Sequence, residues 1–166
     1  MKLTKYILIV FLCLGINSCG FYSFTGATDT PDTFQVNFFQ NSAPLIEPGL
    51  DIQFTNALQD LIVNQTRSEL VKSGAQVVFE GEIVEYRISP TTATADNRAA
   101  QNRLTIGVQV KYTDTTDEEK SFDKRFSFFF DYDGDALLTG SQRDTAWEAI
   151  FERITQDIFQ AAFADW

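Results

Sequence analysis

Four segments of the chain alternate apolar and polar residues, and this period of two predicts four β-strands. The clearest are 104–112 and 122–132, where one parity is almost wholly apolar and the other is polar. Segments 34–38 and 76–89 show the same alternation, and the second is followed by Pro90, which favours a strand end. Strands of this kind belong to a sheet that buries one face and leaves the other in water.

Two further segments repeat their apolar residues at spacings of three and four, which predicts amphipathic helices over 48–66 and 141–163. Pro48 suits the first turn of the earlier helix, and Ser141 can cap the later one. The predicted order is β-α-β-β-β-α. It indicates an α+β fold, a two-layer α/β sandwich in which a four-stranded mixed sheet carries both helices on one face.

Irregular positions add detail to this outline. In segment 76–89 the apolar parity shifts after Ile83, which predicts a β-bulge, and Gly81 suits a bulge or a close contact. Residues 90–102 are polar and lie between two strong strands. We expect them to form a loop, and one longer than a hairpin needs, which favours a functional role for it.

The N-terminal residues have the pattern of a secretory signal peptide. Lys2 and Lys5 precede an apolar run, 6–16, which is followed by small and polar residues. As a helix this run would span about 16 Å, roughly half of the hydrocarbon core of a bilayer. We therefore predict a signal peptide over residues 1–18 that is removed, rather than a span that stays in the membrane.

The residues before Cys19 resemble a bacterial lipobox, with Ile16 at position −3 and Ser18 at −1. The resemblance implies cleavage before Cys19 and an N-acyl diacylglycerol group on it, the N-acyl chain typically a palmitate. Several acyl chains anchor a protein far more firmly than one. The alternative is an ordinary signal peptide with a chance cysteine. Cys19 is thus the predicted lipidation site, with a tether over 19–32 and a single domain over 33–166.

Composition narrows the possible functions. The formal charge of the chain is −10, which argues against nucleic acid as a partner and against attraction to anionic lipid headgroups. The chain has no histidine, and its two cysteines, Cys13 and Cys19, fall in the signal peptide and at the lipobox. Serine- and cysteine-based catalysis with histidine, and zinc sites built on these residues, are therefore excluded.

Two acidic groups remain as candidates for chemistry, and neither is convincing. Glu80, Glu82 and Glu85 could suggest carboxylate catalysis, but the alternation places the first two on the polar face of their strand. The acids of 131–135 lie around a glycine, but their spacing does not fit a calcium loop. We therefore expect no enzyme, no metal site and no cofactor beyond the covalent lipid.

Three arginines and one phenylalanine are the candidate contact residues. Arg87, Arg98 and Arg103 lie within or beside the predicted 90–102 loop, and arginine suits phosphate and carboxylate groups. The alternative is that they pair with acids nearby. Phe129 is an apolar residue on an otherwise polar strand face, which favours contact with a partner.

Four segments, in this order, resemble the lipopolysaccharide-assembly lipoprotein family LptE in its Bacteroidota form: 19–26, 79–83, 102–106 and 162–166. The resemblance implies a β-α-β-β-β-α domain in a Gram-negative envelope, anchored by lipid to the inner leaflet of the outer membrane. It also implies a place inside the lumen of the barrel LptD, as a periplasm-facing plug that helps to assemble this barrel and to deliver lipopolysaccharide to the cell surface.

Family members carry basic residues that contact lipid A, and Arg87, Arg98, Arg103 and Phe129 are our own candidates for contacts with lipopolysaccharide or the partner barrel. Two other functions stay open. One is an accessory lipoprotein of another envelope transport or secretion complex. The other is a lipid-anchored hydrolase that works with carboxylates.

Overall fold

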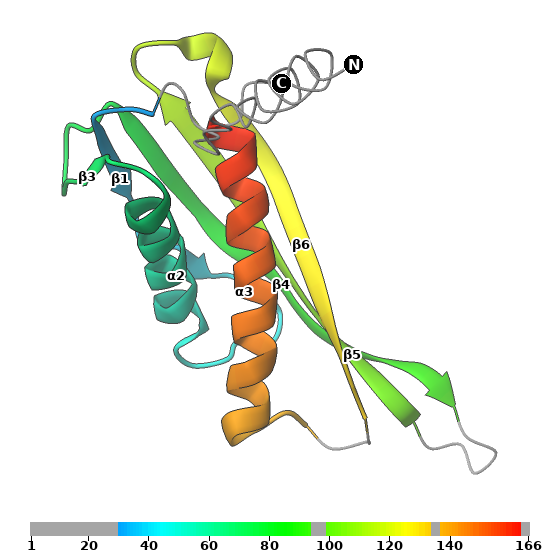
Figure 1. Cartoon of the computed structure of the whole chain (residues 1–166). Helices are drawn as coiled ribbons and strands as arrows, with labels where there is room; N and C mark the ends of the chain where they lie inside the picture. Colours follow the sequence, from blue (N-terminus) through cyan, green and yellow to red (C-terminus); the bar gives the residue numbers. More distant parts are fainter. Residues whose placement is uncertain (1–29, 94–98, 134–136, 164–166) are drawn as a thin grey trace, which may run out of the picture.

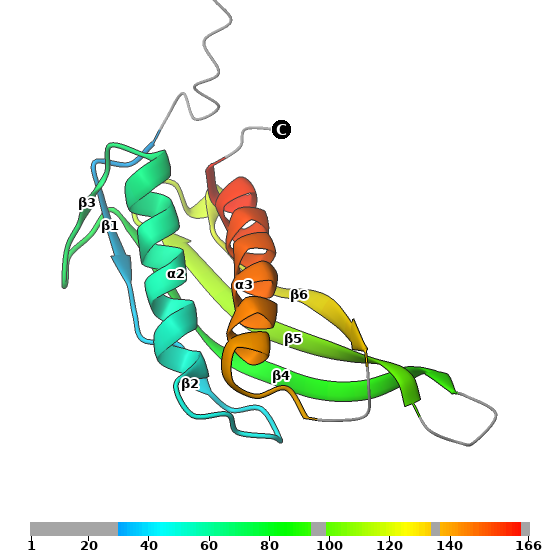
Figure 2. The same ribbon diagram turned by 60° about the horizontal axis from the view of Figure 1, so that its bottom comes forward.

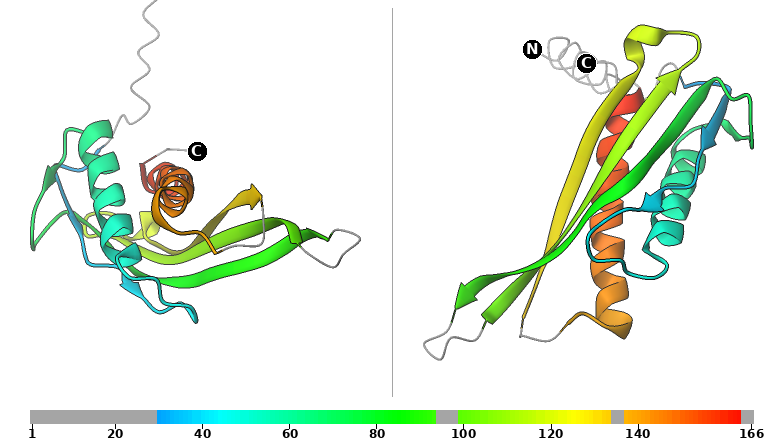
Figure 3. Two further views of the ribbon diagram at one scale, coloured as in Figure 1. Left: turned by 90° about the horizontal axis from the view of Figure 1, so that it is seen from below. Right: turned by 180° about the vertical axis from the view of Figure 1, so that it is seen from behind.

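The structure, a computed structural model, describes residues 30–93, 99–133 and 137–163 of the chain. Two helices lie side by side on one face of a twisted sheet, so the α+β class and the two-layer arrangement predicted from the sequence are confirmed (Figures 1 and 3). The elements follow in the order β1 (Thr33–Val36), β2 (Gln40–Asn41), α2 (Leu50–Gln65), β3 (Glu69–Leu70), β4 (Val77–Ala93), β5 (Ala99–Asp114), the 3₁₀ turn η2 (Glu118–Lys120), β6 (Phe122–Asp133) and α3 (Gly140–Phe163).

The sheet is mixed, as predicted, but the described residues form six strands in it rather than four. The strand order is β3-β1-β4-β5-β6, and β2 also pairs with β4. Strand β1 runs parallel to β3 and β4, whereas β4, β5 and β6 are antiparallel to one another. The two additional strands, β2 and β3, contain two residues each, which is too short for a period of two to be visible in the sequence.

The predicted loop over 90–102 is wrong for most of its length, because β4 continues to Ala93 and β5 begins at Ala99. Pro90 lies inside β4, opposite Asn102. Proline is tolerated there because the described strands β1 and β2 pair with β4 only as far as Ile83, so this part of β4 has a free edge. The β4–β5 hairpin consequently projects beyond both helices (Figure 1).

Both helices begin close to their predicted starts, with small corrections. Helix α2 starts at Leu50, after Gly49 in a left-handed conformation, so Pro48 precedes the helix instead of occupying its first turn. Helix α3 starts at Gly140, and Ser141 is therefore not its cap. Phe54 of α2 makes edge-to-face contacts with Phe39 of the sheet layer and Phe151 of α3. This contact ties the two helices to each other and to the sheet.

The expected irregularities in β4 are confirmed. The register with β5 shifts between Ile83 and Glu85, so Val84 bulges and the inward-facing set continues at Tyr86. Gly81 makes a close contact: an added Cβ atom would lie 2.0 Å from the carbonyl oxygen of Gln109 and 2.8 Å from the ring of Phe39.

Helix α3 packs against β5 and β6, and β5, which lies between β4 and β6, has a fully buried face. The apolar residues of β5 that face the helices are 0–2% exposed. Burying an aliphatic or aromatic side chain of this size contributes roughly 1.5–3 kcal/mol. These side chains are the contribution of β5 to the hydrophobic core: Leu104, Ile106, Val108, Val110 and Tyr112.

Candidate functional site

Because both helices lie on one side, the opposite side of β4, β5 and β6 has no covering layer among the described residues (Figures 2 and 3). We call this surface the bare face. Its side chains alternate with those of the core along each strand, and most are polar or charged. The bare face comprises Glu80, Glu82, Glu85 and Arg87 of β4, Arg103, Thr105, Gly107, Gln109 and Lys111 of β5, and Asp123, Arg125, Ser127, Phe129 and Asp131 of β6.

A three-residue ion network crosses the middle of the bare face. Glu85 of β4 accepts hydrogen bonds from Arg87 on the same strand, at 2.9 Å, and from Arg125, two strands away on β6. Arg125 reaches across β5 over Gly107, where an added Cβ would lie only 3.1 Å from its guanidinium. The glycine therefore opens the path that joins three strands. Although Arg87 is engaged in this way, 57% of its side chain is exposed.

A second cluster lies toward the hairpin. The guanidinium of Arg103 donates two hydrogen bonds to Asp131, at 2.7 and 2.8 Å, and it lies 3.7 Å from the centre of the Phe129 ring. The bidentate pair lowers the pKa of the Asp131 carboxyl and raises the pKa of Arg103. Phe129 is 41% exposed even with the guanidinium over it. The cluster thus offers a flat cation and an aromatic ring to an incoming surface.

At the other end of the bare face the charges are paired in the same manner. Lys111 contacts Glu80 at 2.8 Å, and this hydrogen bond is the main cause of the lowered pKa of Glu80. Gln109 donates to Asp123. Within the described residues, each arginine and lysine named on the bare face has an acidic partner. The cations of this surface are therefore neutralised locally, which suits contact with another polar, patterned surface.

The structure brings three of the candidate residues together and leaves two outside its description. Arg87 and Phe129 flank Thr105 on adjacent strands, and Arg103 lies two residues along β5. Cys19 and Arg98 lie outside the described residues. The sequence analysis missed Arg125 as the residue that links the strands. The alternation already placed Arg125 on this face, but the cross-strand register that directs it to Glu85 has no local signal.

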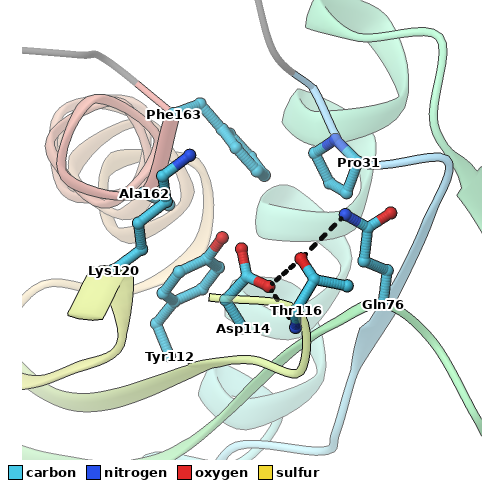
Figure 4. Close-up of a pocket in the computed structure, with 8 residues that line it drawn as sticks. All are labelled: Pro31, Gln76, Tyr112, Asp114, Thr116, Lys120, Ala162 and Phe163. Carbon is cyan, nitrogen blue, oxygen red and sulfur yellow. Dashed lines mark hydrogen bonds between the residues drawn. The ribbon is translucent and has the colours of Figure 1, made fainter. Parts of the chain in front are cut away.

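A small cavity of about 60 Å³ lies where the chain enters the domain, beside the end of α3 (Figure 4). Asp114 is one of the residues that line this cavity. Burial acts to raise the pKa of its carboxyl, but hydrogen bonds from Thr116 and from the Asp117 amide outweigh that effect, so the pKa is lowered. The Asp114 carboxylate thus stabilises the turn over residues 114–117. Small-molecule sites usually measure roughly 300–1,000 Å³, so this cavity is far smaller than a typical ligand site.

Neither a metal centre nor a transmembrane helix is found in the described part of the chain. No three His, Cys, Asp or Glu side chains there lie close enough to hold a metal ion. Across residues 30–93, 99–133 and 137–163, no helix is both long and apolar enough to cross a bilayer.

Solved structures with the same architecture come from several bacteria. A hypothetical protein from Chlamydia trachomatis aligns with a TM-score of 0.54 and 11% identity, over 82% of this chain and 100% of that one. An uncharacterized lipoprotein B from Nitrosomonas europaea gives 0.52 and 14%, over 86% and 90%. Rare lipoprotein B from Shewanella oneidensis gives 0.50 and 12%, over 76% and 89%. Identities this low show a shared fold alone.

Comparison with curated protein sequences gives no match. The comparison with family models does: the model for LptE, described as lipopolysaccharide-assembly, matches residues 32–162. The matched region includes both helices, almost to the end of α3, and every strand of the sheet. The chain therefore belongs to the LptE lipopolysaccharide-assembly family.

Proposed function

We propose that this chain is a lipoprotein, anchored through Cys19 to the inner leaflet of the outer membrane, and that its domain occupies the lumen of an LptD-type barrel. There it would plug the barrel, help it to assemble and assist delivery of lipopolysaccharide to the cell surface. The LptE match over residues 32–162 supports the role in lipopolysaccharide assembly. The bare face is the observation that carries the placement inside a barrel.

The chemistry of the bare face suits the inside of a large barrel. Barrel lumens are polar, and they present fixed rows of side chains rather than bulk water. The charged groups around Glu85 and Arg103 are already paired within the domain. They can form hydrogen bonds to polar side chains of the lumen, and no charge that becomes buried in the contact is then left unpaired. Phe129 adds one apolar contact among them. The helix-covered face meanwhile holds the domain together without help from the partner.

The projecting end of the β4–β5 hairpin is the second part of the proposed contact. It extends past the helices, so it can reach partner surfaces that the body of the domain does not touch (Figure 1). Replacing residues 92–100 by Asn-Gly would close the hairpin with a two-residue turn. We expect this variant to fold, because the core residues of β4 and β5 remain, but to bind the barrel more weakly.

For direct contact with lipopolysaccharide we propose Arg87, Arg98 and Arg103. A lipid A phosphate would have to compete with Asp131 for Arg103, because the carboxylate occupies both donors of the guanidinium edge. Asp131→Asn should therefore raise affinity for lipopolysaccharide, whereas Arg103→Ala should lower it. If both variants bind as the wild type does, Arg103 is not a contact residue.

The lipid anchor has its own test. Cys19→Ser should accumulate as an uncleaved precursor in the inner membrane, and mass spectrometry of the native protein should show an acylated N-terminal cysteine. An unmodified mature N-terminus at another residue would contradict the assignment of Cys19. The outcome does not depend on whether the barrel partner is correctly assigned.

Purification of the native lipoprotein from membranes, followed by mass spectrometry, tests the partner. We expect an LptD-type barrel to copurify. Depletion of the lipoprotein should lower the amount of folded barrel and admit large hydrophobic antibiotics. If no barrel protein copurifies, or if depletion leaves lipopolysaccharide export unchanged, an accessory role in another envelope transport or secretion complex becomes the better explanation.

A further inference from the structure

Strand β6 is an open edge of the sheet. Among the described residues it pairs only with β5, and the register between the two runs from Phe122 to Asp133 without a shift. Alternate residues of an edge strand direct their N–H and C=O groups away from the sheet. In the described part of the chain, strand β6 therefore presents an uninterrupted row of unpaired backbone groups along its 12 residues.

The free part of β4 is built differently. Beyond Ile83, β4 carries the bulge at Val84, then Pro90 and two further register shifts. Bulges and prolines are the features by which natural sheets prevent further strands from pairing. Segment 122–133 contains neither proline nor glycine. The β4 edge is protected against pairing, and most of the β6 edge is not.

The phenylalanines of β6 are covered incompletely. Phe126, Phe128 and Phe130 face α3 but are only partly buried, whereas residues of β5 on the same face are fully buried. One more strand beside β6 would complete this layer. Only Lys124 interrupts the inward row, and it lies 5.1 Å from the Phe122 ring near the start of the strand. An inward lysine of this kind discourages pairing at that end.

The charges and rings of β6 are arranged symmetrically around Phe128. Arg125 lies three residues before it and Asp131 three residues after it, and Phe126 and Phe130 lie two residues on either side. We propose that β6 pairs antiparallel with β6 of a second copy of this chain, about a two-fold axis through Phe128. The occupant is a second copy because this symmetry makes the edge complementary to itself.

In that register each Arg125 faces Asp131 of the second copy, and each Phe126 faces its Phe130. Within each copy, Arg125 already pairs with Glu85 and Asp131 already pairs with Arg103. The new pairs between the copies would continue these rows of charge. Each row would then run from Glu85 and Arg125 of one copy to Asp131 and Arg103 of the other, with the sign of the charge alternating. Opposite-charge and aromatic cross-strand pairs of this kind stabilise antiparallel sheets.

Other registers fit less well. An axis at Ser127 sets Asp123 against Asp131, and like charges directly opposite are destabilising. An axis at Phe129 sets Arg125 against Asp133, the last residue of β6, and places Asp131 opposite Ser127, so Asp131 meets no cation across the joint. With the axis at Phe128, only Asp123 and Asp133 at the outer ends face like charge, so the pairing extends from residue 124 to residue 132.

This inference goes beyond the proposed function and does not rest on it. The β6 edge borders the bare face, so a domain inside a barrel could not keep the second copy. If the domain occupies a barrel as proposed above, the dimer is the state that precedes entry, and in it a Phe-rich edge is shielded from aggregation.

Cysteine cross-linking of the full-length lipoprotein in intact cells tests the register. With the axis at Phe128, two Ser127 positions lie about 8 Å apart, and two Asp123 positions about 33 Å apart. Both residues are exposed on the bare face of β6. Ser127→Cys should therefore give a dimer with a short bismaleimide, whereas Asp123→Cys and the wild type should not. Equal cross-linking of Ser127→Cys and Asp123→Cys, or none at either, overturns the register.

Sedimentation of the purified lipoprotein in detergent tests the dimer itself. We expect a monomer–dimer equilibrium whose dissociation constant rises about tenfold in Arg125→Ala, because each dimer loses two cross-strand pairs. Lys111→Ala, which removes an ion pair of the bare face away from the β6 edge, is the matched control and should leave the constant unchanged. A wild type that stays monomeric at about 100 μM, or equal weakening by both variants, overturns the proposal.

Discussion

The two faces of the same three strands are organised in different ways. On the helix-covered face, neighbours such as Ile106 and Val108 are wholly buried and share many apolar contacts. On the bare face, side chains meet in discrete pairs, for example Lys111 with Glu80 and Arg103 with Asp131, and remain partly exposed. Packing is dense and cooperative, whereas exposed pairs act almost singly. The first face should therefore determine whether the domain folds, and the second what it contacts.

The largest expected effect is on the helix-covered face. Val108→Asp places a carboxylate in the centre of β5, where the wild-type side chain is 0% exposed and lies in the hydrophobic core. Burial of an unpaired charge costs more than about 4 kcal/mol, a large fraction of the stability of a typical domain. We expect no cooperative thermal transition by circular dichroism.

Ser127→Asp on β6 is the matched control on the bare face. Ser127 is exposed, and the new carboxylate can stay in water close to Arg125. The melting temperature of this variant should lie within a few degrees of the wild type. Equal damage by Val108→Asp and Ser127→Asp would mean that both sheet faces are packed in the free domain, and the division drawn above would be wrong.

The two strand glycines give the second comparison. Gly81→Ala on the helix-covered side drives a Cβ atom against the backbone oxygen of Gln109, which cannot move without disturbing the sheet. Overpacking of this kind costs about 1–3 kcal/mol or more. Gly107→Ala meets chiefly the side chain of Arg125, which can swing outward. We expect less than about 1 kcal/mol there, measured by urea unfolding; the reverse order would contradict the assignment of the two faces.

The sequence predicted the fold class because its signals are periodic and local. Both long helices and all four long strands follow from apolar spacing, and the bulge after Ile83 follows from a change of parity within one strand. The positions of Pro48 and Pro90 were misjudged for a different reason. Pro90 is tolerated because β1 and β2 stop pairing with β4 at Ile83, and these strands lie far away in the sequence. Pro48 lies before the helix because Gly49, in a left-handed conformation, directly precedes Leu50.

The candidate site was only half predictable. The alternation placed Arg87, Arg103 and Phe129 on one face, but it did not predict which residues of the neighbouring strands they contact. These contacts depend on the register of β4 with β5, which shifts at the bulge, and on the register of β5 with β6. Both registers are set by packing of the whole sheet. For this reason the link from Arg125 over Gly107 to Glu85 became visible only in three dimensions.

A smaller effect is expected when the Glu85 network is removed. Glu85→Ala leaves Arg87 and Arg125 without their carboxylate, but both arginines are more than half exposed and can return to water. The loss should be about 0.5–1 kcal/mol and should shrink as salt is raised, because exposed ion pairs are screened. Urea unfolding at low and high salt measures it. A loss that does not depend on salt would mean that Glu85 acts through packing.

The smallest expected effect is a difference in acid sensitivity between the two faces. Pairing with Lys111 lowers the pKa of Glu80, and pairing with Arg103 lowers that of Asp131. Such carboxylates stabilise the fold fully above their unfolded pKa, roughly 4, and this contribution is lost as the pH falls through the lower folded values. The free energy of unfolding should therefore drop below about pH 4, and Glu80→Gln should make that drop shallower. Ile106→Val, on the helix-covered face, should instead lower stability by about 1 kcal/mol equally at pH 7 and pH 3.5. If Ile106→Val altered the pH dependence and Glu80→Gln did not, acid sensitivity would belong to the packed layer rather than to the ion pairs of the bare face.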